Sequence, residues 1–168
     1  MLEMSDQFNA REVLTMAVQI ERNGQEFYRE ASSAVDDEQA STLLSDLAGW
    51  EHGHEALFES MRSDLTEEEE SSTAIDPYGE SEMYLKVMAD DHVFRQRTGK
   101  PAREMVAGRS TQEIIDLAIR FEKDSLLFFL GMERLVSPRL GKDRLYKVID
   151  EEIGHISYLE RQRSRLKG

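Results

Sequence analysis

The chain has 168 residues, 39% of them hydrophobic, which suits one globular domain with a single core over residues 1–168. Its formal net charge of −13 disfavours nucleic acid and anionic membranes as partners. The sequence contains no cysteine, which excludes disulfides, iron–sulfur clusters and thiolate zinc sites. Any metal must therefore be held by oxygen and imidazole ligands. No apolar run is long enough to cross a bilayer and the first residues lack a signal-peptide pattern, so we expect a cytoplasmic location and no membrane partner.

Apolar residues recur at spacings of three and four, and no run of period two is convincing. This pattern predicts an all-α fold with four long helices. The first is expected over residues 10–34, where Asn9 and Glu12 are placed as a capping box. The second is expected over 37–61, with Asp36 as its cap. These two helices form the first pair, 10–61.

A long polar connection, residues 62–110, follows the first helix pair. Its first part, "SDLTEEEESSTAIDPYGE", has the composition of a solvated loop. The next part, "SEMYLKVMADDHVFRQ", is typical of a short amphipathic helix, with His92 on its surface. The last part, "TGKPAREMVAGR", is expected to be a linker with a turn or two.

The second helix pair is expected over residues 111–165. Its first helix is predicted over 111–135, opened by Ser110 with Glu113 three residues later. The last helix is predicted to begin at residue 138 or 143, because a serine–proline pair favours a helix start whereas the glycine that follows it disfavours one.

The two helix pairs repeat at an offset of 101 positions. The segment "MAVQIERNGQEF" (16–27) aligns with "LAIRFEKDSLLF" (117–128), and "LAGWEHGHEALF" (47–58) aligns with "VIDEEIGHISYL" (148–159). Aligned cap signals and ionisable residues without a gap indicate two related halves. Within these two segments, the identical ionisable pairs are Glu21 with Glu122, Glu51 with Glu152, and His54 with His155.

All four of these glutamates lie in apolar helix stripes, where carboxylates are seldom found. Each histidine lies three residues after a glutamate and therefore shares its helix face. Four carboxylates in one core cannot all stay ionised without cations, and two divalent metal ions would balance their charge. The alternative, a metal-free network of Glu–His hydrogen bonds, is hard to satisfy fully. We predict two iron ions per chain, with manganese or zinc as alternatives, held by Glu21, Glu51, His54, Glu122, Glu152 and His155.

Other residues in the two Glu-x-x-His segments are assigned differently. His52 aligns with Ile153 and lies about 100° around the helix from its glutamate neighbour, so it is expected at the surface or beside a ligand. At the same offset Glu51 aligns with Glu152 and not with Glu151, so Glu152 is the predicted ligand. Gly53 and Gly154 each precede a predicted ligand histidine, although a helical glycine costs about 1 kcal/mol relative to alanine. Their repetition indicates that a neighbouring helix or a ligand approaches closely at these positions. The alternative is that both glycines are merely tolerated in the helices.

The segments "ERNGQEFYREA", "WEHGH" and "EEIGH" resemble the rubrerythrin-like branch of the ferritin-like superfamily, and the resemblance covers about residues 10–165. It implies a ferritin-like four-helix bundle with a long crossover between helices two and three. Rubrerythrins typically append an iron domain held by Cys-x-x-Cys pairs, which this sequence lacks, so the resemblance implies an external electron donor. They also carry a glutamate at the position of Ser125, and its absence argues against a peroxide-driven movement of one iron.

The resemblance implies a di-iron oxidoreductase that reduces peroxide or dioxygen. The alternatives are an iron-binding ferroxidase for iron handling, and a non-catalytic helical interaction module whose metals stabilise the fold. An organic-substrate oxygenase is less favoured, because the sequence shows no recognisable substrate pocket. Tyr28, seven residues after Glu21, is a candidate for a hydrogen bond to a ligand or for redox chemistry, and a core tyrosine with a satisfied hydroxyl is the alternative.

The segment "SLLFFLGM" (125–132) is apolar almost all the way round a helix, whereas one bundle core covers a single stripe. Either the crossover segment covers the remaining face, which includes Leu127 and Phe128, or another chain does. Because an exposed patch of this kind usually marks an interface, we predict a homodimer, or a larger oligomer built from dimers, with the outer face of this helix in the contact.

Overall fold

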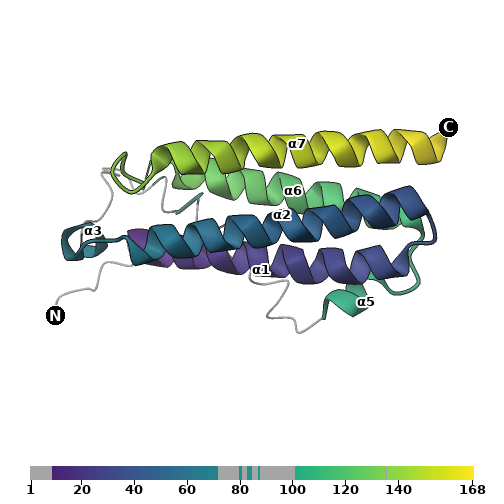
Figure 1. The fold of residues 1–168 in the computed structure, drawn as a ribbon, viewed down its shortest axis with the longest axis horizontal. Helices are drawn as coiled ribbons and strands as arrows, with labels where there is room; N and C mark the ends of the chain where they lie inside the picture. The colour runs from purple at the N-terminus through teal and green to yellow at the C-terminus, as the bar shows by residue number, and fades with distance from the viewer. Residues whose placement is uncertain (1–8, 72–79, 81–82, 85–86, 88–100, 135) are drawn as a thin grey trace.

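The computed structural model describes residues 9–71, 80, 83–84, 87, 101–134 and 136–168. Four long helices run side by side in this part of the chain, and Figure 1 shows them as one elongated bundle. Within the described residues there is no strand, which confirms the all-α prediction. None of the helices described is long and apolar enough to cross a membrane. The long helices are α1 (Ala10–Ala34), α2 (Glu38–Ser63), α6 (Thr111–Met132) and α7 (Lys142–Lys167).

The two helix pairs begin with the same local structure. At the start of α1, the backbone amide of Glu12 donates to the Asn9 side chain and the backbone amide of Asn9 donates to the Glu12 carboxylate, both at 2.9 Å. Ser110 and Glu113 repeat this exchange at the start of α6, at 2.7 and 3.2 Å. Both predicted capping boxes are therefore present, and each fixes the residue at which a helix pair begins.

Three other helix ends differ from the prediction. The cap of α2 is Asp37 rather than Asp36, because the Asp37 carboxylate accepts the backbone amide of Ala40 at 2.8 Å. Helix α6 ends at Met132, before the predicted residue 135. Helix α7 begins after Gly141, whose φ of 107° lies in the left-handed region that favours glycine. The serine–proline pair upstream therefore belongs to a turn and not to the helix.

The crossover contains two short helices, α3 (Glu67–Ser71) and α5 (Ala102–Val106). The prediction of a solvated loop was wrong for α3. There the Thr66 backbone amide donates to the Glu69 carboxylate at 3.1 Å, and Arg139 contacts the same carboxylate from the other half of the chain. The predicted helix over 81–96 lies mostly outside the described residues, as does His92, although Met83, Tyr84 and Val87 are helical.

The four long helices bury two apolar clusters, one toward each end of the bundle. Helix α1 packs chiefly on α2 and α6 on α7, while contacts of α1 with α6 and of α2 with α7 join the two pairs. One cluster includes Leu14, Phe58, Phe129 and Leu145, and the other includes Phe27, Leu44, Ile115 and Leu159. The middle of the bundle lies between them.

The face of α6 that was expected to need a partner is smaller than predicted. Phe128 is fully buried and packs edge-on against Phe129, with ring centroids 6.0 Å apart. It shares the core stripe of Ser125 and Met132, which lie three and four residues away along the helix. Leu127 and Leu130 remain 44% exposed each. The expectation that Phe128 lies on an outer face was therefore wrong, and the predicted patch reduces to the two leucines.

Candidate metal centre

The six predicted ligands meet in the middle of the bundle, although they come from four different helices. Every one of their side chains is buried, with at most 4% of the residue surface exposed. Helix α1 contributes one glutamate, α6 contributes one, and α2 and α7 contribute one Glu-x-x-His pair each. The residues brought together are Glu21, Glu51, His54, Glu122, Glu152 and His155.

The six side chains form two overlapping groups of four. Within each group the ligand atoms lie within 4.8 Å of one another, as metal ligands require. One group holds Glu21 and His54, and the other holds Glu122 and His155. Glu51 and Glu152 belong to both groups, so these two carboxylates are shared between them. The arrangement therefore has the approximate two-fold symmetry that the sequence repeat indicates.

A glycine that sequence reasoning missed makes room for one of the bridging carboxylates. Gly24 lies on α1, three residues after Glu21. A Cβ atom added at Gly24 would lie 3.3 Å from both Cγ and Oε2 of Glu51. Any larger side chain would therefore crowd the Glu51 carboxylate and oblige it to shift. A glycine inside a helix that carries a ligand was the signal available in the sequence.

The unsatisfied polar atoms of the core fit a pair of cations. In the part of the chain that the structure describes, ten buried side-chain nitrogen and oxygen atoms have no hydrogen-bond partner, and eight of them belong to the six predicted ligands. These atoms include both oxygens of Glu21, both oxygens of Glu152 and Nδ1 of both histidines. Buried polar atoms without partners destabilise a fold, so their concentration here supports a metal site with oxygen and imidazole ligands.

The electrostatics of the metal-free centre also indicate missing positive charge. Burial, followed by the negative charge of Glu51, raises the pKa of Glu21 well above its ordinary value of 4.5. Burial, followed by the charge of Glu122, has the same effect on the pKa of Glu152. Burial alone would lower the pKa of His155, but its interactions with Glu122 and Glu51 outweigh this effect and raise the pKa to about 9. Without a metal, the centre therefore holds protons near neutral pH.

Metal binding is expected to release protons near pH 7. His155 has a pKa of about 9 and therefore carries a proton at pH 7, which a divalent cation displaces; the pKa values of Glu21 and Glu152 are raised in the same direction, so any proton they hold is displaced as well. Calorimetric titration with Zn²⁺ in buffers of different ionisation enthalpy measures the number released. An apparent affinity that does not change between pH 6 and pH 8 would contradict this proton release.

The outer sides of the two histidines have different neighbours. Glu151 Oε2 lies 2.7 Å from His54 Nε2, so this carboxylate orients the imidazole while Nδ1 faces the centre. At the position related by the 101-residue offset stands Trp50, whose ring stacks on His155 with centroids 5.1 Å apart and an angle of 13° between the planes. The sequence pattern disfavours Glu151 as a ligand and indicates neither of these supporting roles.

Tyr28 and His52, the other two residues considered in the sequence, lie at different distances from the centre. The Tyr28 hydroxyl donates to Oε1 of Glu122, and burial, followed by the Glu122 charge, raises the pKa of Tyr28 well above its ordinary value. Tyr28 therefore holds the Glu122 carboxylate in place. A redox role for Tyr28 stays a prediction. His52 is exposed, and its Nδ1 atom lies 3.7 Å from the Glu55 carboxylate, away from the centre.

Comparisons with known proteins show the family and the fold of the chain. The sequence model of the Rubrerythrin family matches residues 12–162. A solved structure of a ferritin-like diiron-carboxylate protein from Thermotoga maritima superposes with a TM-score of 0.68 and 21% sequence identity, over 94% of this chain and 96% of that chain. At this identity, the likeness establishes the fold. A search of curated proteins finds no match.

Proposed function

The chain belongs to the rubrerythrin family, and on this premise we propose that it is a di-iron carboxylate oxidoreductase that reduces peroxide or dioxygen with electrons from an external donor. The observation that carries the proposal is the pair of shared carboxylates, Glu51 and Glu152, between two groups of buried ligands. Bound as a ferrous pair, iron supplies the two electrons that convert peroxide to water.

The side chains of this protein have separate tasks in that chemistry. Glu51 and Glu152 belong to both ligand groups, so they would hold both metal ions and would help to balance changes in their charge. Glu151 fixes the ring of His54, and Tyr28 fixes the carboxylate of Glu122. The apolar clusters on both sides of the centre exclude bulk water along the bundle axis.

The composition supports an external electron donor and a six-ligand centre. The 168 residues contain no cysteine and therefore no thiolate iron site of their own. Ser125 lies one helical turn after Glu122, is buried, and carries a hydroxyl instead of a carboxylate. It therefore offers no seventh carboxylate toward which a metal ion can move.

A peroxide titration of the ferrous protein under anaerobic conditions tests the proposal. We expect one peroxide per chain to oxidise two ferrous ions in one fast phase, because the two metal positions share ligands. A parallel reaction with dioxygen identifies the preferred oxidant. Continued uptake of excess iron by a large cage would support iron handling instead, and ferrous protein that resists both oxidants would support a structural metal site.

We further propose a homodimer that buries the outer face of α6. Leu127 and Leu130 are 44% exposed, and Met83 and Val87 of the crossover are also exposed. Light scattering is expected to give twice the mass of the chain, 19.4 kDa, at micromolar concentration. The double substitution Leu127→Glu and Leu130→Glu should shift this mass toward the monomer, because it places charges in an apolar contact. A monomeric unmodified protein would overturn this proposal.

A further inference from the structure

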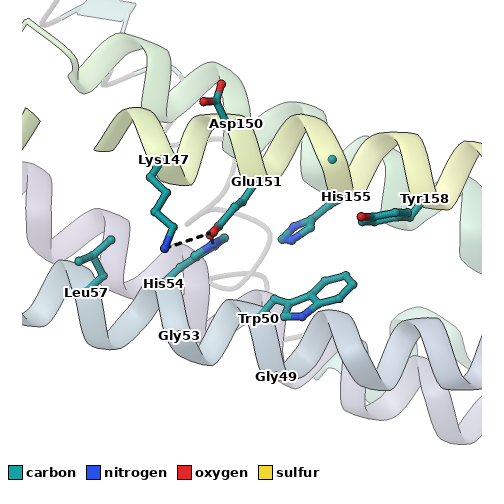
Figure 2. A pocket seen from close by; sticks show the side chains of 11 residues that line it. Gly49, Trp50, Gly53, His54, Leu57, Lys147, Asp150, Glu151, His155 and Tyr158 are labelled. Atoms are coloured by element: carbon teal, nitrogen blue, oxygen red, sulfur yellow. Dashed lines mark hydrogen bonds and ion pairs between the residues drawn. The ribbon is translucent and has the colours of Figure 1, made fainter. Parts of the chain in front are cut away.

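A cleft between α2 and α7 opens directly onto the two histidines of the metal centre. Its volume is about 680 Å³, within the range of about 300–1,000 Å³ that is usual for small-molecule sites. Figure 2 shows Trp50 and Tyr158 beside the His155 ring, and Lys147 and Glu151 near His54. The cleft therefore joins solvent to the outer sides of two predicted metal ligands.

Three helical glycines keep the cleft open. A Cβ atom added at Gly49 or Gly53 would meet nothing within 4 Å, and one added at Gly154 would meet only the Tyr158 ring, at 3.9 Å. Close approach of a neighbouring helix therefore does not explain them. Each destabilises its helix relative to alanine. What the three glycines share is that all of them line the cleft, which indicates that the space itself is used.

Aromatic surface faces this space. Trp50 is 39% exposed and Tyr158 is 45% exposed, and their ring centroids lie 5.7 Å apart. The Trp50 ring also stacks on His155, so a molecule in contact with Trp50 is one side chain away from a metal ligand. Exposed aromatic faces that line a cleft suit a flat conjugated molecule, which gains stacking and buried apolar area together.

The charges around the cleft disfavour an anionic ligand. Lys147 contributes a cation, but its Nζ lies 3.8 Å from a Glu151 oxygen and is partly neutralised by it. Asp150 also lines the cleft, and the chain has a net charge of −13. A ligand without net negative charge is therefore favoured over a phosphorylated one.

We propose that the α2–α7 cleft binds the external electron donor, that this donor is an uncharged planar two-electron carrier of the flavin or quinol class, and that Trp50 links it to His155. This inference rests on the proposed function. The reduced carrier gives up two electrons and two protons and leaves as its oxidised form. The electrons return two ferric ions to the ferrous state, and the two protons balance those consumed when peroxide becomes two molecules of water.

Binding is tested first with oxidised riboflavin on metal-free protein, so that metal chemistry does not contribute to the signal. Trp50 is the only tryptophan of the chain, so its fluorescence reports directly on the cleft. We expect saturable quenching in the unmodified protein. Gly49→Leu should weaken binding at least about tenfold, because it fills the cleft at a position where the helix has free space. Tyr146→Leu removes an exposed aromatic ring of α7 outside the cleft and is the matched control.

Substitutions at Trp50 separate stacking from mere occupation of space. Because they remove the fluorophore, quenching of riboflavin fluorescence is measured instead. Trp50→Phe keeps a ring and should retain most of the affinity, whereas Trp50→Leu should lose about tenfold. Quenching that is equal in the unmodified, Gly49→Leu and Trp50→Leu proteins would overturn the proposal.

Electron delivery is tested on ferric, metal-loaded protein with two reductants. Reduced riboflavin should reduce the Gly49→Leu protein at least about tenfold more slowly than the unmodified protein, in line with its weaker binding. Dithionite, a small inorganic reductant, should reduce both proteins equally. Equal rates with reduced riboflavin would overturn the proposed route. Oxidation of ferrous protein by peroxide needs no donor, so failure of the proposed function is distinguished from failure of this inference.

Discussion

The metal-loaded protein is expected to unfold about 10–20 °C above the metal-free protein near neutral pH. A ligand that binds only the folded state at 100 times its dissociation constant stabilises it by about 2.7 kcal/mol, so two such sites contribute about 5 kcal/mol. For a chain of this size, each kcal/mol shifts the midpoint by about 2–4 °C. Scanning calorimetry with and without a chelator measures the shift, and identical midpoints would contradict a buried metal centre.

The thermal unfolding midpoint of the metal-free protein should fall as pH rises from about 5 to about 9. Glu21 and Glu152 have pKa values raised above 4.5, and the pKa of His155 rises from 6.5 to about 9. Each such group contributes stability that is complete below its ordinary pKa and is lost as pH rises through the raised value. Glu122 has a lowered pKa and acts in the opposite sense, but only under acidic conditions. The difference in unfolding temperature between the metal-loaded and the metal-free protein should therefore increase with pH.

The second large effect concerns two histidines that lie two residues apart. His54→Ala should lower metal affinity by more than the roughly 10- to 100-fold that is typical when a residue supporting a ligand is changed, because it removes a ligand atom itself. His52→Ala is the matched control, since it removes the same side chain from an exposed position on the same helix. Metal analysis after dialysis compares the two variants. Equal losses would show that the helix face carrying the ligands is wrongly assigned.

The meeting of these six side chains in one place could be predicted because their signal is local and occurs twice. An offset of 101 residues aligns each glutamate and histidine with a partner, and the i, i+3 spacing selects His54 over His52. The structure then places all six side chains together. The capping boxes were predictable for the same reason, since each depends on residues three positions apart.

Features that depend on packing between helices could not be predicted in this way. Phe128 lies in a segment that is apolar on all sides, so the sequence does not show which stripe faces the core. Glu151 and Trp50 act on histidines of the opposite half, and their roles follow only from how α2 lies beside α7. Three glycines line the cleft, and the sequence repeat at Gly53 and Gly154 was visible, but only the packing of α2 beside α7 shows that these glycines leave open space.

Anomalous diffraction from crystals grown with iron tests the dinuclear centre most directly. Data collected on both sides of the iron absorption edge locate each ion independently of the protein atoms. We expect two iron peaks per chain, both in contact with Glu51 and Glu152, with Glu21 and His54 beside one and Glu122 and His155 beside the other. A single peak, or peaks away from these side chains, would contradict it.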